Sequence, residues 1–576
     1  MMRSGAQIVW ACLAEQGVRV VFGMPGGGIM PTYHPRSEHE IHHVLVRHEQ
    51  AAAHAADGYA RVTGEVGVAI TTSGPGATNL TTGIATAMMD SIPLVCITGQ
   101  VKTSLIGSDA FQEADITGIT LPITKHNFLV TDVRELADTM REAFRIAREG
   151  RPGPVLVDLP KDVQFAETDY APCNVQGDSQ TVQRDGIPAE SIDGIEQALE
   201  YIACCRRPVI LAGHGVARAG AQADLIRFAE RCGIPVTTTL LGKWGFPHAH
   251  PLHLGMMGMH GAAEANHAIQ NADLLIALGM RFDDRVTGRV EAYAPMARKV
   301  HVDIDASEIN KIIRVDVGIV ANVADVLSTF IESAPAAEHA EWIDQIRGWR
   351  SESMTRDLLH RSVVAGLTVP HVIDELGRQT GGQAIVVTDV GQNQMWAAQY
   401  FGADAMRPFL TSGGLGTMGY GLPAAIGAQI AAPEAEVWSL AGDGGFQMNL
   451  QELATVVQER LPIRMAILNN GYLGMVRQWQ ELFFDARYEA TKLLNPDFVR
   501  IAEAYGIPAL RATSHDTART AIEEARGVQG PVLIEFQTVI EGDEANVYPM
   551  VPSGAALDEM VRRPVPTGVV GRRGEG

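Results

Sequence analysis

Two glycine-rich turns in the last third of the chain combine residue types that could hold a phosphate group and a divalent cation. The first, Gly442-Asp443-Gly444, ends an apolar run, and the second, Asn469-Asn470-Gly471, ends the next one. Glycines let backbone amides approach a ligand closely, and a helix that begins there favours an anionic phosphate. A carboxylate oxygen, an amide oxygen and a diphosphate suit the octahedral coordination of Mg²⁺.

The spacing of these turns favours one shared site over two unrelated tight turns. Asn470 follows Asp443 by 27 residues, which is the length of one strand–helix–strand crossover. Because ligands bind outside the carboxyl ends of strands in open parallel sheets, we expect both side chains to lie at that edge.

Glu49 is a third candidate, at the start of an Ala-rich stretch that is typical of a helix. An acidic residue at this point is also favoured by the helix macrodipole. Taken alone, Glu49 is therefore better explained as an acid that stabilises the helix N-terminus. Only the surrounding sequence can favour a catalytic role instead.

The strings around these residues resemble the catalytic subunits of the acetolactate synthase family, which depend on thiamin diphosphate (ThDP). Val46 to Arg61, Gly442 to Thr455 and Leu468 to Gln480 carry the resemblance, which extends from Gly17 to Val561. It implies an enzyme that decarboxylates pyruvate and transfers the two-carbon unit to pyruvate or 2-ketobutyrate. The products would be 2-acetolactate or 2-aceto-2-hydroxybutyrate, on the route to valine, leucine and isoleucine.

The resemblance assigns residues to ThDP and to its metal ion. Glu49 is expected to hydrogen-bond to N1′ of the aminopyrimidine, which favours loss of the proton at thiazolium C2. Met418 is expected beneath the cofactor, where it holds the bent conformation. The metal ion is expected on Asp443, Asn470 and Tyr472. The other expected ThDP contacts are Gly26, Gly27, Gly391, Gln392, Asn393, Gly416, Gly442, Gly444, Gly445, Leu473, Gly474 and Met475.

Five more residues are implied on the substrate side. Phe111 and Gln112 are expected beside the substrate, and Lys161 near its entrance, although a solvated surface lysine is the simple alternative. The fork of Arg285 suits the carboxylate of a 2-keto acid. Trp479 is expected to favour 2-ketobutyrate through contact with one extra methylene, worth about 1–3 kcal/mol. A surface ion pair for Arg285 and core packing for Trp479 are the structural alternatives.

The resemblance also implies FAD in the middle of the chain, with no net redox change. Gly213-His214-Gly215 follows an apolar run but is a degraded dinucleotide motif and weak evidence by itself. The residues expected to contact FAD are Arg151, Gly213, Gly215, Thr239, Leu240, Met259, His260, Gly279, Arg281, Asp303 and Ile304.

The sequence departs from the family pattern at two single residues and one pair of residues. Lys102 stands where relatives often have Pro or a small residue, so the channel wall is expected to differ. Asn393 replaces the usual His and can still donate a hydrogen bond, but it cannot carry a charge. Ala321-Asn322 replaces a frequent Gly-Asp pair near the expected flavin.

Partners and rival functions follow from the same resemblance. Because family members build each site from two chains, we expect a homodimer or homotetramer, with room for a separate regulatory subunit. A first alternative is another ThDP carboligase or decarboxylase that acts on a different 2-keto acid. A second is a flavoprotein oxidase.

The sequence predicts that these residues are positioned by an α/β fold, because short Val/Ile/Leu runs typical of strands alternate with Ala-rich stretches typical of helices. We expect three doubly wound parallel-sheet domains: residues 1–165 bind the ThDP pyrimidine, 188–335 are FAD-binding-like, and 365–540 bind the diphosphate and Mg²⁺. Residues 167–186 are interpreted as a linker and 541–576 as a C-terminal tail without regular pattern. The predicted strands are Val18–Phe22, Val66–Thr71, Leu94–Thr98, Val155–Asp158, Val209–Ala212, Val236–Thr239, Leu274–Leu278, Val300–Ile304, Ala384–Thr388, Val437–Ala441, Arg464–Leu468 and Val532–Glu535.

Composition narrows the classes of partner. The 576 residues carry a formal charge of −21, which argues against nucleic acid and against an anionic membrane surface. Six cysteines without CxxC spacing indicate reduced thiols in a cytoplasmic protein. No apolar run reaches about 18 residues, so no membrane span is expected.

Overall fold

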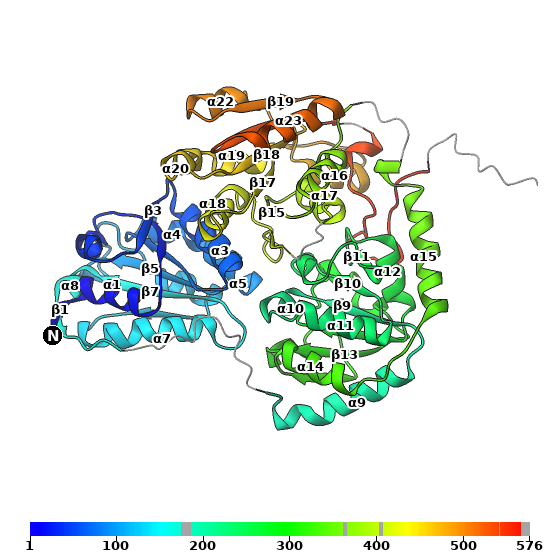
Figure 1. Ribbon diagram of the computed structural model, residues 1–576. Helices are drawn as coiled ribbons and strands as arrows, with labels where there is room; N and C mark the ends of the chain where they lie inside the picture. Colours follow the sequence, from blue (N-terminus) through cyan, green and yellow to red (C-terminus); the bar gives the residue numbers. More distant parts are fainter. Residues whose placement is uncertain (174–185, 361–365, 403–406, 541, 566–576) are drawn as a thin grey trace, which may run out of the picture.

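The computed structural model describes residues 1–173, 186–360, 366–402, 407–540 and 542–565. Three domains follow one another along the chain, coloured blue to cyan, green, and yellow to red (Figure 1). Each contains a six-stranded sheet in which all strand pairs are parallel. Helices flank these sheets, so the predicted α/β class is confirmed.

The N-terminal sheet has the strand order β3-β2-β4-β5-β7-β6. Its inner strands are continuous apolar runs, as expected for strands buried on both faces. The strands are β2 (Val20–Met24), β3 (His42–Leu45), β4 (Gly67–Thr71), β5 (Leu94–Gln100), β6 (His126–Leu129) and β7 (Pro154–Pro160). The helices are α1 (Gly5–Glu15), α2 (Met30–Tyr33), α3 (Glu49–Thr63), α4 (Pro75–Asn79), α5 (Thr81–Asp90), α6 (Ile116–Thr120), α7 (Leu136–Arg148) and α8 (Lys161–Phe165).

The C-terminal sheet repeats that arrangement, with the order β16-β15-β17-β18-β20-β19. Counted from its own first strand, each of these two sheets runs 2-1-3-4-6-5. The strands are β15 (Ile385–Thr388), β16 (Phe409–Leu410), β17 (Val437–Gly442), β18 (Arg464–Asn469), β19 (Ala509–Ala512) and β20 (Val532–Gln537). The helices are α16 (Val369–Thr380), α17 (Gln392–Tyr400), α18 (Gly421–Ala431), α19 (Asp443–Met448), α20 (Leu453–Gln458), α21 (Gly474–Phe483), α22 (Phe498–Ala504) and α23 (His515–Gly527).

The middle sheet differs, with the order β11-β10-β9-β12-β13-β14. Counted in the same way it runs 3-2-1-4-5-6, the order of dinucleotide-binding domains. The strands are β9 (Pro208–Ala212), β10 (Val236–Thr238), β11 (His253–Met256), β12 (Leu274–Leu278), β13 (Arg298–Asp303) and β14 (Val317–Val320). The helices are α9 (Ile192–Cys204), α10 (His214–Arg218), α11 (Gln222–Cys232), α12 (Ala263–Asn271), α13 (Asp284–Thr287), α14 (Val323–Ser333) and α15 (Ala340–Met354).

Two segments that were expected to be irregular are more structured than predicted. Within the expected linker, β8 (Glu167–Asp169) pairs antiparallel with β1 (Met2–Ser4), while residues 174–185 lie outside the described residues. The C-terminal tail has little regular structure, yet Val547, Met550 and Val551 are buried. It is therefore part of the packed molecule as far as Arg563, which is buried, and residues 566–576 lie beyond the described residues.

Helices α3 and α18 join the two outer domains. Their side chains belong to one continuous apolar core that also includes strands of both sheets. Glycines let the backbones touch: a Cβ on Gly427 would lie 1.8 Å from the Ala55 carbonyl oxygen, and one on Gly58 would lie 2.1 Å from that of Ala424. The small residues in both helices thus set an unusually close crossing.

Gly427→Ala is expected to destabilise the protein by about 1–3 kcal/mol or more, because backbone atoms on α3 must move to admit one methyl group. The measurement is the midpoint of thermal unfolding. Gly348→Ala is the matched control: Gly348 is also helical, but a Cβ there meets nothing within 4 Å. Equal midpoints for the two variants would contradict the close crossing.

Candidate active site

Asp443 lies at the carboxyl end of β17, as the sequence predicts. Only 2% of its surface is exposed, and burial raises the pKa of its carboxyl. The Oδ2 atom accepts hydrogen bonds from the Gly471 amide (2.9 Å) and from Asn495 Nδ2 (2.6 Å). Neighbouring strands β17 and β18 thus bring the two predicted turns into contact.

Asn470 is close to the same edge and is oriented by its own turn. Its Oδ1 atom accepts from the Tyr472 amide (3.0 Å), and its Nδ2 atom lies 3.4 Å from Gln392 Oε1. Gln392 donates to Gln478 Oε1 and to the Ala545 carbonyl, each at 2.8 Å. Oxygen atoms and backbone amides gather here, which is a donor set suited to Mg²⁺ and phosphate.

Apolar side chains cover the start of α19. A Cβ on Gly444 would lie 2.7 Å from Leu473 Cδ2 and 3.6 Å from Met418 Cε. Met418 and Leu473 therefore both lie over the glycine turn, where the family resemblance places a wedge beneath the cofactor. Their side chains lie only partly buried, so a ligand can still reach them.

Asp389 is a residue of this site that sequence reasoning missed. It follows β15, is buried, and accepts hydrogen bonds from the amides of Val390, Gly419 and Gly421. Burial raises its pKa to about 6. Its carboxylate therefore fixes the loop that carries Gly416 and Met418; its place directly after an apolar run was the available signal.

Asn393 is held by the backbone instead of being free for a ligand. Its Nδ2 atom donates to the carbonyls of Asp389 (2.8 Å) and Leu440 (3.1 Å). Both amide hydrogens are thereby used, which differs from the expectation that this side chain donates to a diphosphate. Asn393 instead joins the ends of β15 and β17.

Glu49 begins α3, where only 9% of its surface is exposed. Asn79 Nδ2 donates to its Oε2 atom at 2.9 Å. A Cβ on Gly76 would lie 3.2 Å from its Oε1 atom, so the Gly74–Asn79 turn closes over the carboxyl. This loop and the Gly26–Gly28 loop pack together, since the Gly28 amide donates to Thr72 Oγ1.

The loop of residues 101–114 carries Phe111 and Gln112 at the same edge. Gln112 packs its backbone against Gly74, while Phe111 is 89% exposed. Lys161 begins α8, next to Asp162, which accepts hydrogen bonds from the amide and the hydroxyl of Thr103.

A buried carboxyl that the sequence did not single out supports that loop. Asp158 accepts from Thr98 Oγ1 (2.8 Å) and Gln100 Nε2 (2.9 Å), and Gln100 also donates to the Ala114 carbonyl. Burial raises the pKa of Asp158 to about 7. Both ends of the loop are thus fixed, whereas its tip is exposed.

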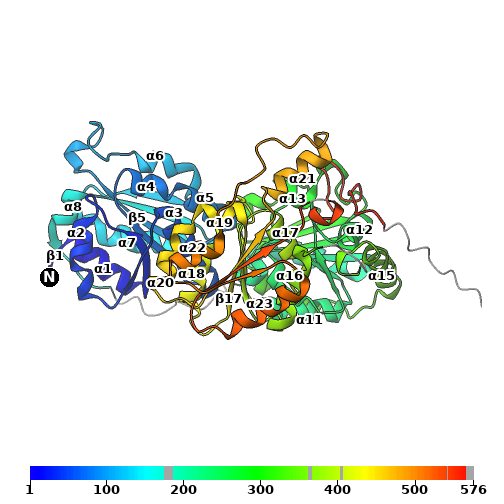
Figure 2. The ribbon, with the colours of Figure 1, turned by 90° about the horizontal axis from the view of Figure 1, so that it is seen from above.

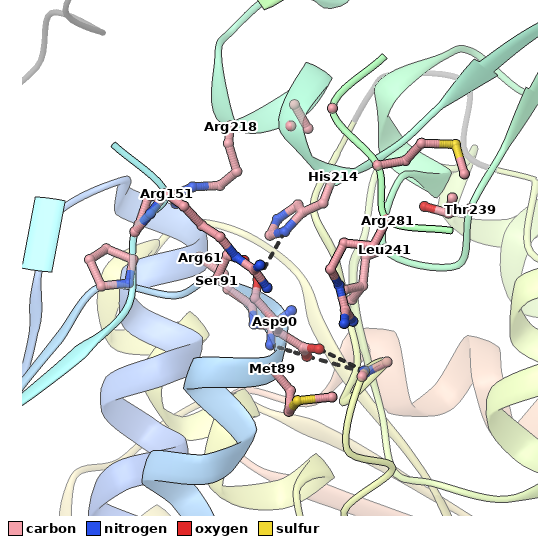
Figure 3. A pocket seen from close by; sticks show the side chains of 18 of the residues that line it. Arg61, Met89, Asp90, Ser91, Arg151, His214, Arg218, Thr239, Leu241 and Arg281 are labelled. Atoms are coloured by element: carbon pink, nitrogen blue, oxygen red, sulfur yellow. Dashed lines mark hydrogen bonds and ion pairs between the residues drawn. The ribbon is translucent and has the colours of Figure 1, made fainter. Parts of the chain in front are cut away.

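A cavity of about 1980 Å³ lies where the three domains meet (Figure 3). Ten of the eleven residues expected at the flavin line it: Arg151, Gly215, Thr239, Leu240, Met259, His260, Gly279, Arg281, Asp303 and Ile304. The eleventh, Gly213, lies just behind, where a Cβ would be 2.2 Å from the Gly279 carbonyl oxygen.

The cavity extends to the C-terminal domain, where Gly391, Gly416 and Met475 also line it. At this end the Arg285 guanidinium lies 5.9 Å from the centre of the Trp479 ring, and α13 and α21 are neighbours in Figure 2. The structure therefore brings together the two residues that the sequence assigns to the acceptor substrate, from two different domains.

Glu49, Phe111, Gln112 and Lys161 are not among the residues that line this cavity. Within the part of one chain that the structure describes, the predicted site residues thus do not share one cavity. Arg285 and Trp479 line it, whereas Glu49 in the N-terminal domain and Asp443 and Asn470 in the C-terminal domain do not.

Two further contributors lie late in the chain. Asn495 joins Asp443 to Asn469, since it also donates to Asn469 Oδ1 at 2.9 Å. The C-terminal segment supports the end of the cavity at which Arg285 lies, because the Val551 amide donates to the carbonyl of Met259, which lines that cavity, at 2.7 Å. Neither lies in a pattern that marks a site in the sequence.

Among the residues that the structure describes, no three His, Cys, Asp or Glu side chains cluster in a way that could hold a metal ion. The Asp443 turn supplies a single carboxylate, so a divalent cation there needs ligand phosphates as well. In the same described ranges, no helix has the length and apolar character to cross a membrane.

Comparison with known proteins gives matches along the whole chain. Models of thiamine pyrophosphate (TPP, the same molecule as ThDP) enzymes match as the N-terminal TPP binding domain (residues 3–119), the central domain (195–330) and the C-terminal TPP binding domain (389–536). The acetolactate synthase large subunit of Corynebacterium glutamicum is 48% identical over 97% of this chain and 90% of its own. The probable acetolactate synthase large subunit of Methanocaldococcus jannaschii is 46% identical over 97% and 95%.

Proposed function

Because this chain belongs to the acetolactate synthase family of thiamine pyrophosphate enzymes, we propose that it joins two 2-keto acids with loss of CO₂. Pyruvate is the donor, and pyruvate or 2-ketobutyrate is the acceptor. The products, 2-acetolactate and 2-aceto-2-hydroxybutyrate, lead to branched-chain amino acids. The observation that carries the proposal is the contact of Arg285 with Trp479 at a cavity shared with the ThDP-side glycines.

The residues at the end of β17 and β18 fit ThDP with Mg²⁺. Asp443 and Asn470 would supply oxygen ligands, Tyr472 would complete the protein's share, and the amides at the start of α19 would bind the diphosphate. When bound, ThDP supplies an electron sink that stabilises the carbanion left by decarboxylation. Glu49 would provide the proton at N1′ of the aminopyrimidine, and Met418 with Leu473 would hold the ring system in place.

A homodimer, or a tetramer built from such dimers, would complete the site. Support comes from the separation of Glu49 from the cavity within one chain and from the exposed Phe111. A second chain could bring its Glu49, Gln112 and Lys161 to the Asp443 turn. A separate regulatory subunit remains a prediction, and the name "large subunit" of two relatives favours it. The cytoplasmic location also remains a prediction.

FAD fits the cavity as a resident group without a redox role. The 3-2-1-4-5-6 order of the middle sheet places a crevice between β9 and β12, where the strand order reverses. Gly279 follows β12, Gly215 lies in the helix α10 that follows β9, and the backbones of these two glycines touch. The predicted flavin residues line that crevice.

Trp479→Leu is expected to lower the preference for 2-ketobutyrate over pyruvate by about 10-fold or more, as one methylene contact is worth about 1–3 kcal/mol. Competition between the two acceptors, with both products quantified, measures this ratio. Phe483→Leu is the matched control, because Phe483 packs edge-on against Trp479, whereas Arg285 lies over the Trp479 ring itself. An unchanged ratio in Trp479→Leu would remove Trp479 from acceptor selection.

The test of the proposed function is product analysis with purified protein, pyruvate, ThDP, Mg²⁺ and FAD, omitting each cofactor in turn. We expect acetolactate that requires ThDP and Mg²⁺. Acetaldehyde instead of acetolactate would favour a different ThDP decarboxylase. Oxygen uptake in proportion to pyruvate consumed would favour a flavoprotein oxidase, and either result would overturn the proposal.

A further inference from the structure

Arg218 occupies the position at which a dinucleotide-binding loop usually has its last glycine. In the pattern Gly-x-Gly-x-x-Gly, the third glycine lets the helix pack closely on the sheet. Here the string is Gly213-His214-Gly215-Val216-Ala217-Arg218. An arginine at that point ends α10 and lines the cavity between the domains.

The side chain of Arg218 points into the cavity toward Arg151, which comes from the N-terminal domain (Figure 3). Arg151 is neutralised by Glu308 (2.8 Å) and Asp305 (3.3 Å). Arg61, which also lines the cavity, is paired with Asp57 and Asp90 at 2.6 and 2.7 Å. Three cationic side chains therefore converge, and two of them already have carboxylates.

Arg218 has no such partner within the described ranges. No carboxylate of these residues forms an ion pair with it, and its Nε atom is buried without a hydrogen bond. Burial and the nearby Arg61 lower the pKa of its guanidinium to about 10. A cation in this setting is costly unless an anion enters to pair with it.

We propose that Arg218 binds the diphosphate of the dinucleotide in this cavity, adding a positive charge where the usual glycine loop offers only backbone amides. The inference rests on the proposed FAD site and adds to it the residue that recognises the phosphates. Helix α10 has only five residues, so its N-terminus is too short to stabilise the diphosphate by itself. A guanidinium can instead form two parallel hydrogen bonds to phosphate oxygens.

The experiment measures the binding of FAD, ADP and riboflavin to full-length protein freed of nucleotide, by flavin fluorescence and by calorimetry. For Arg218→Gln we expect the Kd of FAD and of ADP to rise by about tenfold or more. The Kd of riboflavin, which has no phosphate, should be unchanged. Arg218→Lys should recover part of the loss, because it keeps the charge but not the fork.

Arg145→Gln is the matched control. Arg145 lines the same cavity but is paired with Glu142 and Glu149, so its replacement should leave all three Kd values unchanged. Unchanged binding of FAD and ADP by Arg218→Gln would overturn the inference while leaving the FAD site intact. A wild-type protein that binds ADP but not FAD would overturn the flavin assignment. Comparing the Kd of ADP for the wild type with that for Arg218→Gln would still test the role of Arg218. Circular dichroism spectra of the variants show whether each is folded.

Discussion

Glu49→Gln is expected to lower the rate of acetolactate formation by at least about 100-fold, because positioned proton transfer contributes about 10²–10⁴-fold to a rate. Glutamine has the same shape and can still accept the hydrogen bond from Asn79. It cannot, however, exchange a proton with N1′ of the aminopyrimidine. The variant should therefore fold, bind ThDP and lose turnover.

Two measurements separate this role from a structural one. Calorimetry should give a ThDP affinity within a few-fold of the wild type, and exchange of the C2 proton of bound ThDP, followed by NMR, should be slowed together with turnover. Glu142→Gln, on the outer face of α7, should change neither. Turnover near the wild-type rate in Glu49→Gln would rule out the assignment.

Asp443→Ala is expected to weaken the Mg²⁺-dependent binding of ThDP by at least about 100-fold. Replacing a residue that only hydrogen-bonds to a metal ligand typically lowers metal affinity by about 10- to 100-fold. Asp443 should matter more, because it is the one carboxylate among the three predicted ligands. Its removal also leaves the Gly471 amide and Asn495 without their acceptor. Titrations of Mg²⁺ at fixed ThDP, and of ThDP at fixed Mg²⁺, give both affinities.

Asn495→Ala provides the graded comparison. It removes a hydrogen bond to Asp443 without removing a ligand, so its effect should fall within the 10- to 100-fold range and below that of Asp443→Ala. Flavin binding should stay the same in both variants, because the middle domain is untouched. A Mg²⁺ affinity unaffected by Asp443→Ala would place the metal elsewhere.

The strands that could be predicted from the sequence are the inner ones. All twelve predicted strands are present, and they are the four inner strands of each sheet. The six strands of these sheets that were missed, β3, β6, β11, β14, β16 and β19, are the edge strands; the short pair β1 and β8 was missed as well. Edge strands bury less of their surface, so His126–Leu129 and Ala509–Ala512 lack the continuous apolar run that marks a central strand.

For the site, two residues that follow buried strands at a recognisable spacing could be predicted, whereas residues that support them through hydrogen bonds were missed, including Asp389, although it also follows a buried strand. Asp443 and Asn470 lie where the crossover spacing places them. Asp389, Asp158 and Asn495 act through backbone amides or loops whose positions depend on the whole fold. The C-terminal segment was missed for a related reason: its apolar side chains are buried without any helical or strand period.

The close crossing of α3 and α18 bears on how this molecule can move. Where glycine backbones touch across two helices, neither can slide or rotate without a collision between main-chain atoms. The two outer domains of one chain should therefore move as a single rigid body on every timescale short of unfolding. Any opening that admits a 2-keto acid must come from the parts attached more loosely to that body: the loop bearing Phe111, the middle domain, or the segment that follows the last sheet.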